Sequence, residues 1–256
     1  MTDLLTDELT LVAQIRSASN VTLVGRIGDA EHGTAVVYKP VSGERPLWDF
    51  PDGTLAGREV AAHLVSEATG WDVVPRTWLR DGPVGPGMVQ LWCEADPAQE
   101  AVTLVPAEDL PDGWHHVIDG LDADENLVSL VHEESEALRR MAVFDVLTNN
   151  ADRKGGHVLE MAGGHRHGID HGLTFHAEHK LRTVLWGWIG EPLTTEELAG
   201  VDRVRGALMG DLGTALAEHV TAEEVEALAA RCDRLYDEAV FPAPTGHMPA
   251  VPWPPF

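Results

Sequence analysis

The sequence predicts an α+β protein of two lobes, with a small antiparallel sheet in the first lobe and mostly helices in the second. Short β-branched and apolar runs separated by turn residues fill much of residues 21–92, with one helical stretch among them. From residue 133 to 240, apolar residues recur mainly at helical spacing. The 256 residues, 44% of them hydrophobic, are enough for one domain or for two small lobes.

The composition restricts the kinds of partner that the protein can have. A net charge of -24 argues against extended contact with nucleic acid or an anionic membrane, because both require clustered Lys and Arg. The two cysteines, Cys93 and Cys232, form neither a disulfide framework nor a CxxC metal motif. No apolar run approaches the length of a membrane span, and no basic leader follows Met1. We therefore expect a cytoplasmic protein whose partners are small molecules or proteins.

The first lobe is expected to begin with a helix and to continue as a small sheet with one further helix. In chain order the patterns predict a capped helix at 6–13, strands at 21–29 and 34–40, a helix at 55–67, and strands at 73–79 and 87–92. The first turn between strands holds Gly28 and Gly33, and it either covers nucleotide phosphates or is an ordinary hairpin turn. Lys39 could reach a phosphate or lie in solvent. Glu59, expected in the first turn of its helix, either complements the helix dipole or orients Lys39.

The second lobe is expected to be mostly helical. An irregular, acidic segment at 94–124 is predicted to be the hinge that separates it from the first lobe. The patterns then predict a helix at 133–147, a short hairpin of 158–161 with 167–169, and helices at 194–208, 211–220 and 221–240. Thr221 and Glu224 have the spacing of a capping box. The predicted division is a lobe at 1–93, a hinge at 94–124, a helical lobe at 125–241 and a proline-rich tail at 242–256 that is either extended along the surface or disordered.

The candidate site lies in two neighbouring stretches of the second lobe. Asp152 follows the helix at 133–147 in a polar loop, and Asp170 follows the short apolar run that ends at Ile169. Phosphoryl transfer requires a carboxylate that orients the acceptor, metal-binding side chains and a cation on the nucleotide phosphates. Arg153 and Lys154 either form a solvated basic patch or neutralise a phosphate as charge develops in the transition state.

These residues follow one another in a familiar order. The runs containing Lys39 (VVYKP), Glu59 (REVA), Asp152 (NADRKGGH) and Asp170 (IDHGL) resemble the phosphatidylinositol 3- and 4-kinase-like family over roughly residues 21–180. The chain is especially similar to the compact bacterial members, which are related to HipA-type kinases. The resemblance implies a two-lobed protein-kinase-like fold and a kinase that uses ATP with Mg²⁺ or Mn²⁺.

The resemblance also implies a role for each residue of the nucleotide site. Lys39 would contact the ATP phosphates and pair with Glu59. The segment Leu91, Trp92 and Cys93 would border the adenine as the interlobe hinge.

The remaining roles concern the chemistry. Asp152 would orient the attacking hydroxyl, with Arg153 and Lys154 beside it, and Asp170 would bind the metal. His157 stands where these kinases usually place an asparagine that holds a second metal. Because magnesium prefers oxygen ligands and imidazole suits manganese better, His157 indicates an altered metal preference, another role or weak activity.

Other functions remain open at this point. The acceptor could be a protein hydroxyl, a small alcohol or a lipid headgroup, and nucleotidyl transfer would use the same cleft. The departure at His157 is compatible with a nucleotide-binding pseudokinase or regulatory module. A metallohydrolase would instead gather Asp170 with histidines from the following cluster: His165, His167, His171, His176 and His179.

Overall fold

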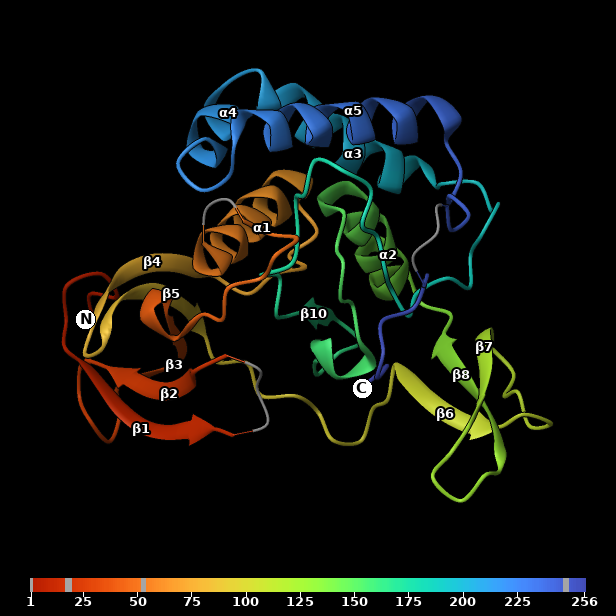
Figure 1. Cartoon of the computed structure of the whole chain (residues 1–256), viewed down its shortest axis with the longest axis horizontal. Helices are drawn as coiled ribbons and strands as arrows, with labels where there is room; N and C mark the ends of the chain where they lie inside the picture. Colours follow the sequence, from red (N-terminus) through yellow and green to blue (C-terminus); the bar gives the residue numbers. More distant parts are fainter. Residues whose placement is uncertain (1, 17–19, 52–53, 246–248) are drawn as a thin grey trace.

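The computed structural model describes residues 2–16, 20–51, 54–245 and 249–256. A five-stranded antiparallel sheet forms the N-terminal region and helices dominate the C-terminal region, so the α+β class is confirmed (Figure 1). A separate three-stranded sheet lies beside the helices. The boundaries assigned to the lobes remain predictions. No helix within the described residues combines the length and the apolar character that a membrane crossing requires.

The N-terminal sheet has the strand order β1-β2-β3-β5-β4. Its strands are β1 (Leu9–Ile15), β2 (Thr22–Ile27), β3 (Thr34–Pro40), β4 (Thr77–Gly82) and β5 (Gly85–Leu91). A short 3-10 helix, η1 (Val41–Gly43), follows β3. On one face of the sheet, side chains from several strands form a small core: Leu9, Ile27, Val36, Tyr38, Trp78 and Val89.

The prediction of a helix at 6–13 is wrong, because this segment supplies β1. Leu9 pairs with Ile27 of β2 and is buried, whereas Val12 is exposed. The run Leu-Thr-Leu-Val is rich in residues that favour strands, and the neighbouring strand β2 satisfies its backbone. The cap-like residues Thr6 and Asp7 had suggested a helix start that the tertiary pairing overrides.

The glycine-bearing turn that was a candidate to cover the phosphates lies away from the cleft. The β2–β3 turn with Gly28 and Gly33 lies at the opposite end of β3 from Lys39, roughly 20 Å away at about 3.3 Å per residue. It therefore cannot cover phosphates bound at Lys39. The end of β1 and the start of β2 border the cleft instead, since Ile15 and Thr22 line the same cavity as Lys39; residues 17–19 between them lie outside the described part of the chain.

Helix α1 (Leu55–Thr69) is packed between the sheet and the helical region (Figure 1). Ala56 and Val60 pack with Met88 of β5, whereas Ala61 and Val65 belong to the large core of the helical region. Burial on two sides explains why the helix is not strongly amphipathic. The Thr54 hydroxyl accepts a hydrogen bond from the Gly57 amide and caps the helix.

Residues 94–124 are not irregular as predicted. They contribute β6 (Val102–Pro106) and β7 (Trp114–Leu121), which flank β8 (Leu127–Glu133) in an antiparallel sheet. The two strands were not predicted because prolines and many acidic residues lie in the turn between β6 and β7 and at the ends of these strands. Along β6 and β7 most residues are exposed or only partly buried, so these two strands lack long apolar runs.

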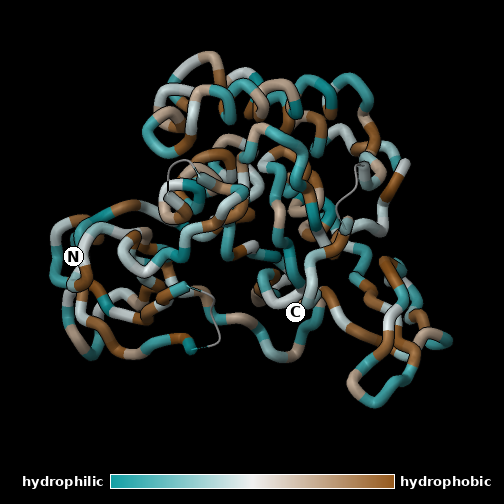
Figure 2. Tube along the Cα trace, in the orientation of Figure 1, coloured by the Kyte–Doolittle hydropathy of each residue, from teal (hydrophilic) through white to brown (hydrophobic). Residues whose placement is uncertain are grey.

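The helical region confirms most of the expected elements with shifted bounds. Its elements are α2 (Glu136–Thr148), η2 (Gly155–His157), β9 (Val158–Glu160), β10 (Arg166–Gly168), α3 (Thr195–Leu208), α4 (Asp211–Leu216) and α5 (Ala222–Glu238). Along α5, hydrophilic and hydrophobic residues alternate, as expected for an outer helix (Figure 2). The capping box of Thr221 with Glu224 is present, and α3 has another of Thr194 with Glu197.

Residues 249–256 of the proline-rich tail are bound to the helical region. The Thr183 amide donates a hydrogen bond to the Ala250 carbonyl (3.0 Å), and the Gly155 amide donates one to the Pro255 carbonyl (2.8 Å). Phe256 lies so close to Gly155 that a Cβ at that glycine would come within 2.3 Å of its ring. The tail thereby brings an aromatic side chain to the loop that carries the candidate catalytic residues.

Candidate active site

Lys39 stands at the centre of the site, where three segments far apart in sequence meet. Its Nζ atom lies 2.6 Å from Glu59 Oε1 and 2.7 Å from Asp170 Oδ1. Lys39 comes from β3, Glu59 from α1 and Asp170 from the loop after β10. The structure thus joins the three residues that the sequence placed in one site.

Burial distinguishes the two carboxylates. The Glu59 side chain is 2% exposed, and its second oxygen accepts a hydrogen bond from the His171 amide (3.0 Å). Glu59 is not in the first turn of α1 as expected: the helix begins at Leu55, and its first turn holds no acidic residue. The helix dipole therefore does not explain Glu59, whereas orientation of Lys39 does. The Asp170 side chain is 51% exposed and faces the cleft.

Electrostatics favour the charged forms of Lys39 and Asp170. Attraction to Lys39 lowers the pKa of Asp170. Burial disfavours the charged form of Lys39, but Asp170 and Glu59 more than offset it and raise the Lys39 pKa. Burial raises the pKa of Glu59, while Lys39 and the His171 amide act in the opposite direction. Lys39 is therefore held as a cation between two carboxyl groups, of which Asp170 is the one that faces the cleft.

His157 is oriented toward Asp170. Its Nδ1 lies 2.9 Å from the Asp152 carbonyl, to which it donates, and its Nε2 lies 3.4 Å from Asp170 Oδ2. Burial lowers the His157 pKa, so the ring is neutral near pH 7 and Nε2 presents a lone pair to a carboxylate oxygen. Two acceptors that face each other are a donor set for a cation, and a backbone hydrogen bond on the other nitrogen is typical of a metal-binding histidine.

Asp152 lies beside this pair with two cations around it. Lys154 Nζ is 3.3 Å from Asp152 Oδ2, and Arg182 Nη2 is 3.8 Å from Oδ1. The Asp152 amide donates to the Asn150 side-chain oxygen (3.0 Å), which fixes the start of the loop. The carboxylate of Asp152 is 21% exposed and therefore accessible from the cleft.

The structure corrects the role expected for Arg153. Its side chain is fully buried and forms an ion pair with Asp145 of α2 at 2.9 Å. It also donates hydrogen bonds to the carbonyls of His157 and Ile169, and its Nη2 lies 2.7 Å from His171 Nε2. Arg153 therefore cannot contact a substrate in this structure. It holds the Asp152 loop and the Asp170 loop together, and it is a positioning residue.

The residues that build this support were not predicted from the sequence. Asp145 is fully buried and also accepts hydrogen bonds from Asn150 Nδ2 (3.0 Å) and from the Thr183 hydroxyl (3.2 Å). Asn149 ends α2 in the left-handed conformation, with φ of 53°. An acid within the apolar face of a predicted helix was the available signal, because a buried carboxylate requires a partner.

Two cavities meet at the candidate site. The larger, about 660 Å³, is lined by Leu91, Trp92 and Cys93 together with Lys154 and His157. The smaller, about 310 Å³, extends toward Glu44 and Arg45. The residues common to both cavities are Thr22, Lys39, Asp152 and Asp170. The structure therefore brings the segment predicted to border the adenine, residues 91–93, to one cleft with the predicted catalytic and metal-binding residues. Arg153 is the single exception.

The histidines of the cluster at 165–179 do not gather around Asp170. His165 and His167 lie with Asp72 instead. The His171 ring is buried and bonded to Arg153, and His179 lines a different cavity of about 420 Å³. The arrangement expected for a metallohydrolase centred on Asp170 and this cluster is therefore not formed.

Comparison with known proteins places the chain in a family. No protein-family model matches it. Protein Rv2133c of Mycobacterium tuberculosis (strain ATCC 25618 / H37Rv) is 50% identical over 258 residues, which covers 97% of this chain and 92% of that protein. The chain belongs to the Rv2133c family. That name states no activity, so the function of this member of the Rv2133c family must be argued from its site.

Among solved structures, the proinflammatory kinase CtkA of Helicobacter pylori is similar to this member of the Rv2133c family with a TM-score of 0.48 and 11% identity. The alignment covers 94% of this chain and 95% of the CtkA chain. No residue role is transferred from a likeness at this level.

Proposed function

We propose that the protein is a kinase-like phosphotransferase that moves the terminal phosphoryl group of ATP to a hydroxyl acceptor. The observation that carries the proposal is the contact of Lys39 Nζ with both Glu59 (2.6 Å) and Asp170 (2.7 Å) at the meeting point of two cavities. A lysine held by a buried glutamate, beside a cleft aspartate, is the arrangement that positions nucleotide phosphates in kinases.

The larger cavity is the proposed nucleotide site. Its volume of about 660 Å³ falls within the roughly 300–1,000 Å³ typical of small-molecule sites. The amides of Leu91 and Trp92 are used within the sheet, where they donate to the carbonyls of Arg76 and Ala35. We therefore place the adenine against the backbone that follows, at Cys93, with the phosphates reaching back toward Lys39.

The residues present fit a divalent cation. Asp170 Oδ2 and His157 Nε2 would hold it, one oxygen and one nitrogen donor that face each other across 3.4 Å. When bound, such an ion supplies charge neutralisation to the phosphates. A nitrogen donor favours Mn²⁺ relative to Mg²⁺.

The acceptor is proposed to enter through the smaller cavity, which shares Asp152 and Asp170 with the nucleotide site. Asp152 accepts the proton of the acceptor hydroxyl while the acceptor oxygen forms a bond to the terminal phosphorus and the bond to the ADP oxygen breaks. Lys154 lies 3.3 Å from Asp152 and lines the larger cavity, where it contributes positive charge. A volume of about 310 Å³ suits a protein side-chain hydroxyl or a small alcohol.

One alternative has an observation in its favour. His157 occupies the place where the phosphatidylinositol 3- and 4-kinase-like pattern has asparagine. A histidine in that place would weaken a magnesium site. A nucleotide-binding module without efficient transfer would share every feature described for the nucleotide cavity. Turnover separates the two proposals, whereas binding does not.

Calorimetry of ATP binding, with Mg²⁺ and then with Mn²⁺, tests the proposal on the wild type and on Asp170→Asn. The wild type should bind ATP in a metal-dependent manner, and Asp170→Asn should weaken that binding by at least about tenfold because a metal-binding carboxylate is lost. Asp109→Asn is the matched control, since Asp109 is exposed and lines neither cavity of the cleft. Absence of ATP binding with either metal would refute the proposal.

Asp152→Asn tests the transfer step. We expect ATP binding close to that of the wild type and a loss of roughly 10²–10⁴-fold in ATP turnover or autophosphorylation, the usual contribution of a general base. Binding without turnover in the wild type would favour the nucleotide-binding module. Equal loss of binding and turnover in Asp152→Asn would indicate that this residue only supports the loop.

A further inference from the structure

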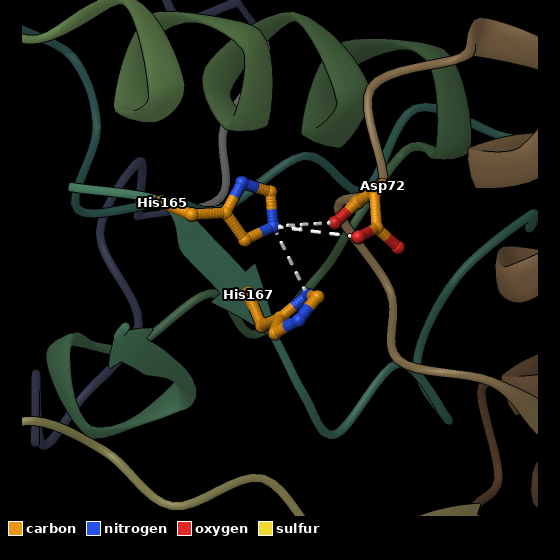
Figure 3. A group of neighbouring side chains, drawn as sticks. All are labelled: Asp72, His165 and His167. Atoms are coloured by element: carbon orange, nitrogen blue, oxygen red, sulfur yellow. Dashed lines mark hydrogen bonds and ion pairs between the residues drawn. The ribbon is translucent and has the colours of Figure 1, made fainter. Parts of the chain in front are cut away.

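A second cluster of metal-binding side chains lies outside the cleft. Asp72 follows α1, whereas His165 and His167 come from the β9–β10 hairpin, and the side chains converge from two separate segments (Figure 3). One ligand atom from each residue lies within 4.8 Å of the other two. Among the residues that the structure describes, no other group of three His, Cys, Asp or Glu meets this condition.

The distances match a tetrahedral ion. His165 Nε2 lies 3.3 Å from His167 Nδ1 and 3.8 Å from Asp72 Oδ2. Zinc binds imidazole nitrogen and carboxylate oxygen at about 2.0–2.2 Å, so two ligand atoms on one tetrahedral zinc are separated by roughly 3.3–3.5 Å. The two ring nitrogens already have this separation, and the Asp72 carboxylate oxygen lies a few tenths of an ångström further from His165 Nε2 than it requires. His165 Nε2 also lies 2.9 Å from the Asp72 carbonyl oxygen, and a bound ion would replace that hydrogen bond.

We propose that Asp72, His165 and His167 bind one Zn²⁺ ion, with water as the fourth ligand. Two imidazoles and one carboxylate select zinc over the harder ions Mg²⁺ and Ca²⁺. Asp72 is 69% exposed and His165 is 36% exposed, so an ion can enter directly from solvent. The three residues line neither the 660 Å³ nor the 310 Å³ cavity of the cleft, which makes this a site separate from the proposed phosphotransfer centre.

The position of the site gives it a structural consequence. The Gly168 amide of β10 donates a hydrogen bond to the Val73 carbonyl (2.7 Å), so the two segments already run side by side next to the cluster. The segment around Asp72 follows the helix that carries Glu59, and β10 leads directly to Asp170. Bound zinc braces the Glu59 helix against the strand that positions Asp170.

Zinc binding is measured on the metal-free full chain at pH 7.5 by equilibrium dialysis with elemental analysis. Substitution with Co²⁺ provides a second readout, because a tetrahedral Co²⁺ site with nitrogen ligands absorbs visible light. The test variants are His167→Ala and Asp72→Asn, and Asp72→Asn preserves the shape of an exposed side chain. His32→Ala is the matched control, since His32 and Asp29 form an exposed pair (3.3 Å) that lacks a third ligand.

The wild type and His32→Ala should each bind one zinc per chain. His167→Ala and Asp72→Asn should each bind zinc at least about tenfold more weakly, because even the loss of an outer-shell partner typically costs about 10–100-fold in metal affinity. Asp170→Asn should retain the zinc, which separates this site from the cleft. Equal zinc affinity in His167→Ala and the wild type, or loss of zinc in Asp170→Asn alone, would overturn the proposal.

Discussion

Replacement of Arg153 by methionine tests whether this residue holds the two loops of the site together. The side chains of Arg153 and Asp145 are both fully buried and 2.9 Å apart. Arg153→Met leaves the Asp145 carboxylate buried with only the Asn150 amide and the Thr183 hydroxyl as donors. Breaking one partner of a buried ion pair costs about 3–5 kcal/mol, so the free energy of unfolding should fall by that amount.

Urea denaturation followed by tryptophan fluorescence measures the effect. With an m-value of about 3 kcal/mol/M, the midpoint should decrease by roughly 1–1.7 M. Arg205→Met is the matched control: Arg205 pairs with Asp233 at 2.5 Å but is 45% exposed, and exposed pairs contribute about 0–1 kcal/mol. The double variant Asp145→Leu with Arg153→Met should recover part of the loss. A midpoint shift in Arg153→Met no larger than that in Arg205→Met would refute the positioning role.

Two further predictions concern histidines. His157→Asn should raise ATP turnover with Mg²⁺ relative to Mn²⁺, because it replaces a nitrogen donor with oxygen; an unchanged metal preference would remove His157 from the metal site. Burial lowers the pKa of the His132 imidazole to about 4 in the folded protein. Between pH 6.5 and 4 the unfolded state therefore binds a proton that the folded state does not, so the free energy of unfolding decreases as the pH falls through that window. This change in the His132 pKa corresponds to about 3 kcal/mol of unfolding free energy, and His132→Gln should reduce the pH dependence of urea unfolding by that amount. If the free energy of unfolding of His132→Gln varied with pH as that of the wild type does, His132 would not be the group responsible.

Much of the candidate site was predictable because short local sequence patterns indicate where its acidic residues lie. Asp152 and Asp170 follow apolar elements and stand beside glycines, which fixes them in loops at the ends of helix and strand. Lys39 and Glu59 carried little information individually, since a lysine at a strand end and a glutamate in a helix are common. Their pairing depends on how α1 lies against β3, and no local pattern encodes that contact.

The sequence by itself determined the α+β class, the order of most elements and the identity of the charged residues that could perform phosphoryl transfer. Tertiary structure decided that residues 9–15 are a strand, since their backbone pairs with β2, a contact that the local sequence does not encode. It also decided that Arg153 is buried support rather than a catalytic cation, because exposure is a property of the packed chain. Likewise, His165 and His167 became a candidate zinc site only when folding placed Asp72, 93 residues before His165, beside them.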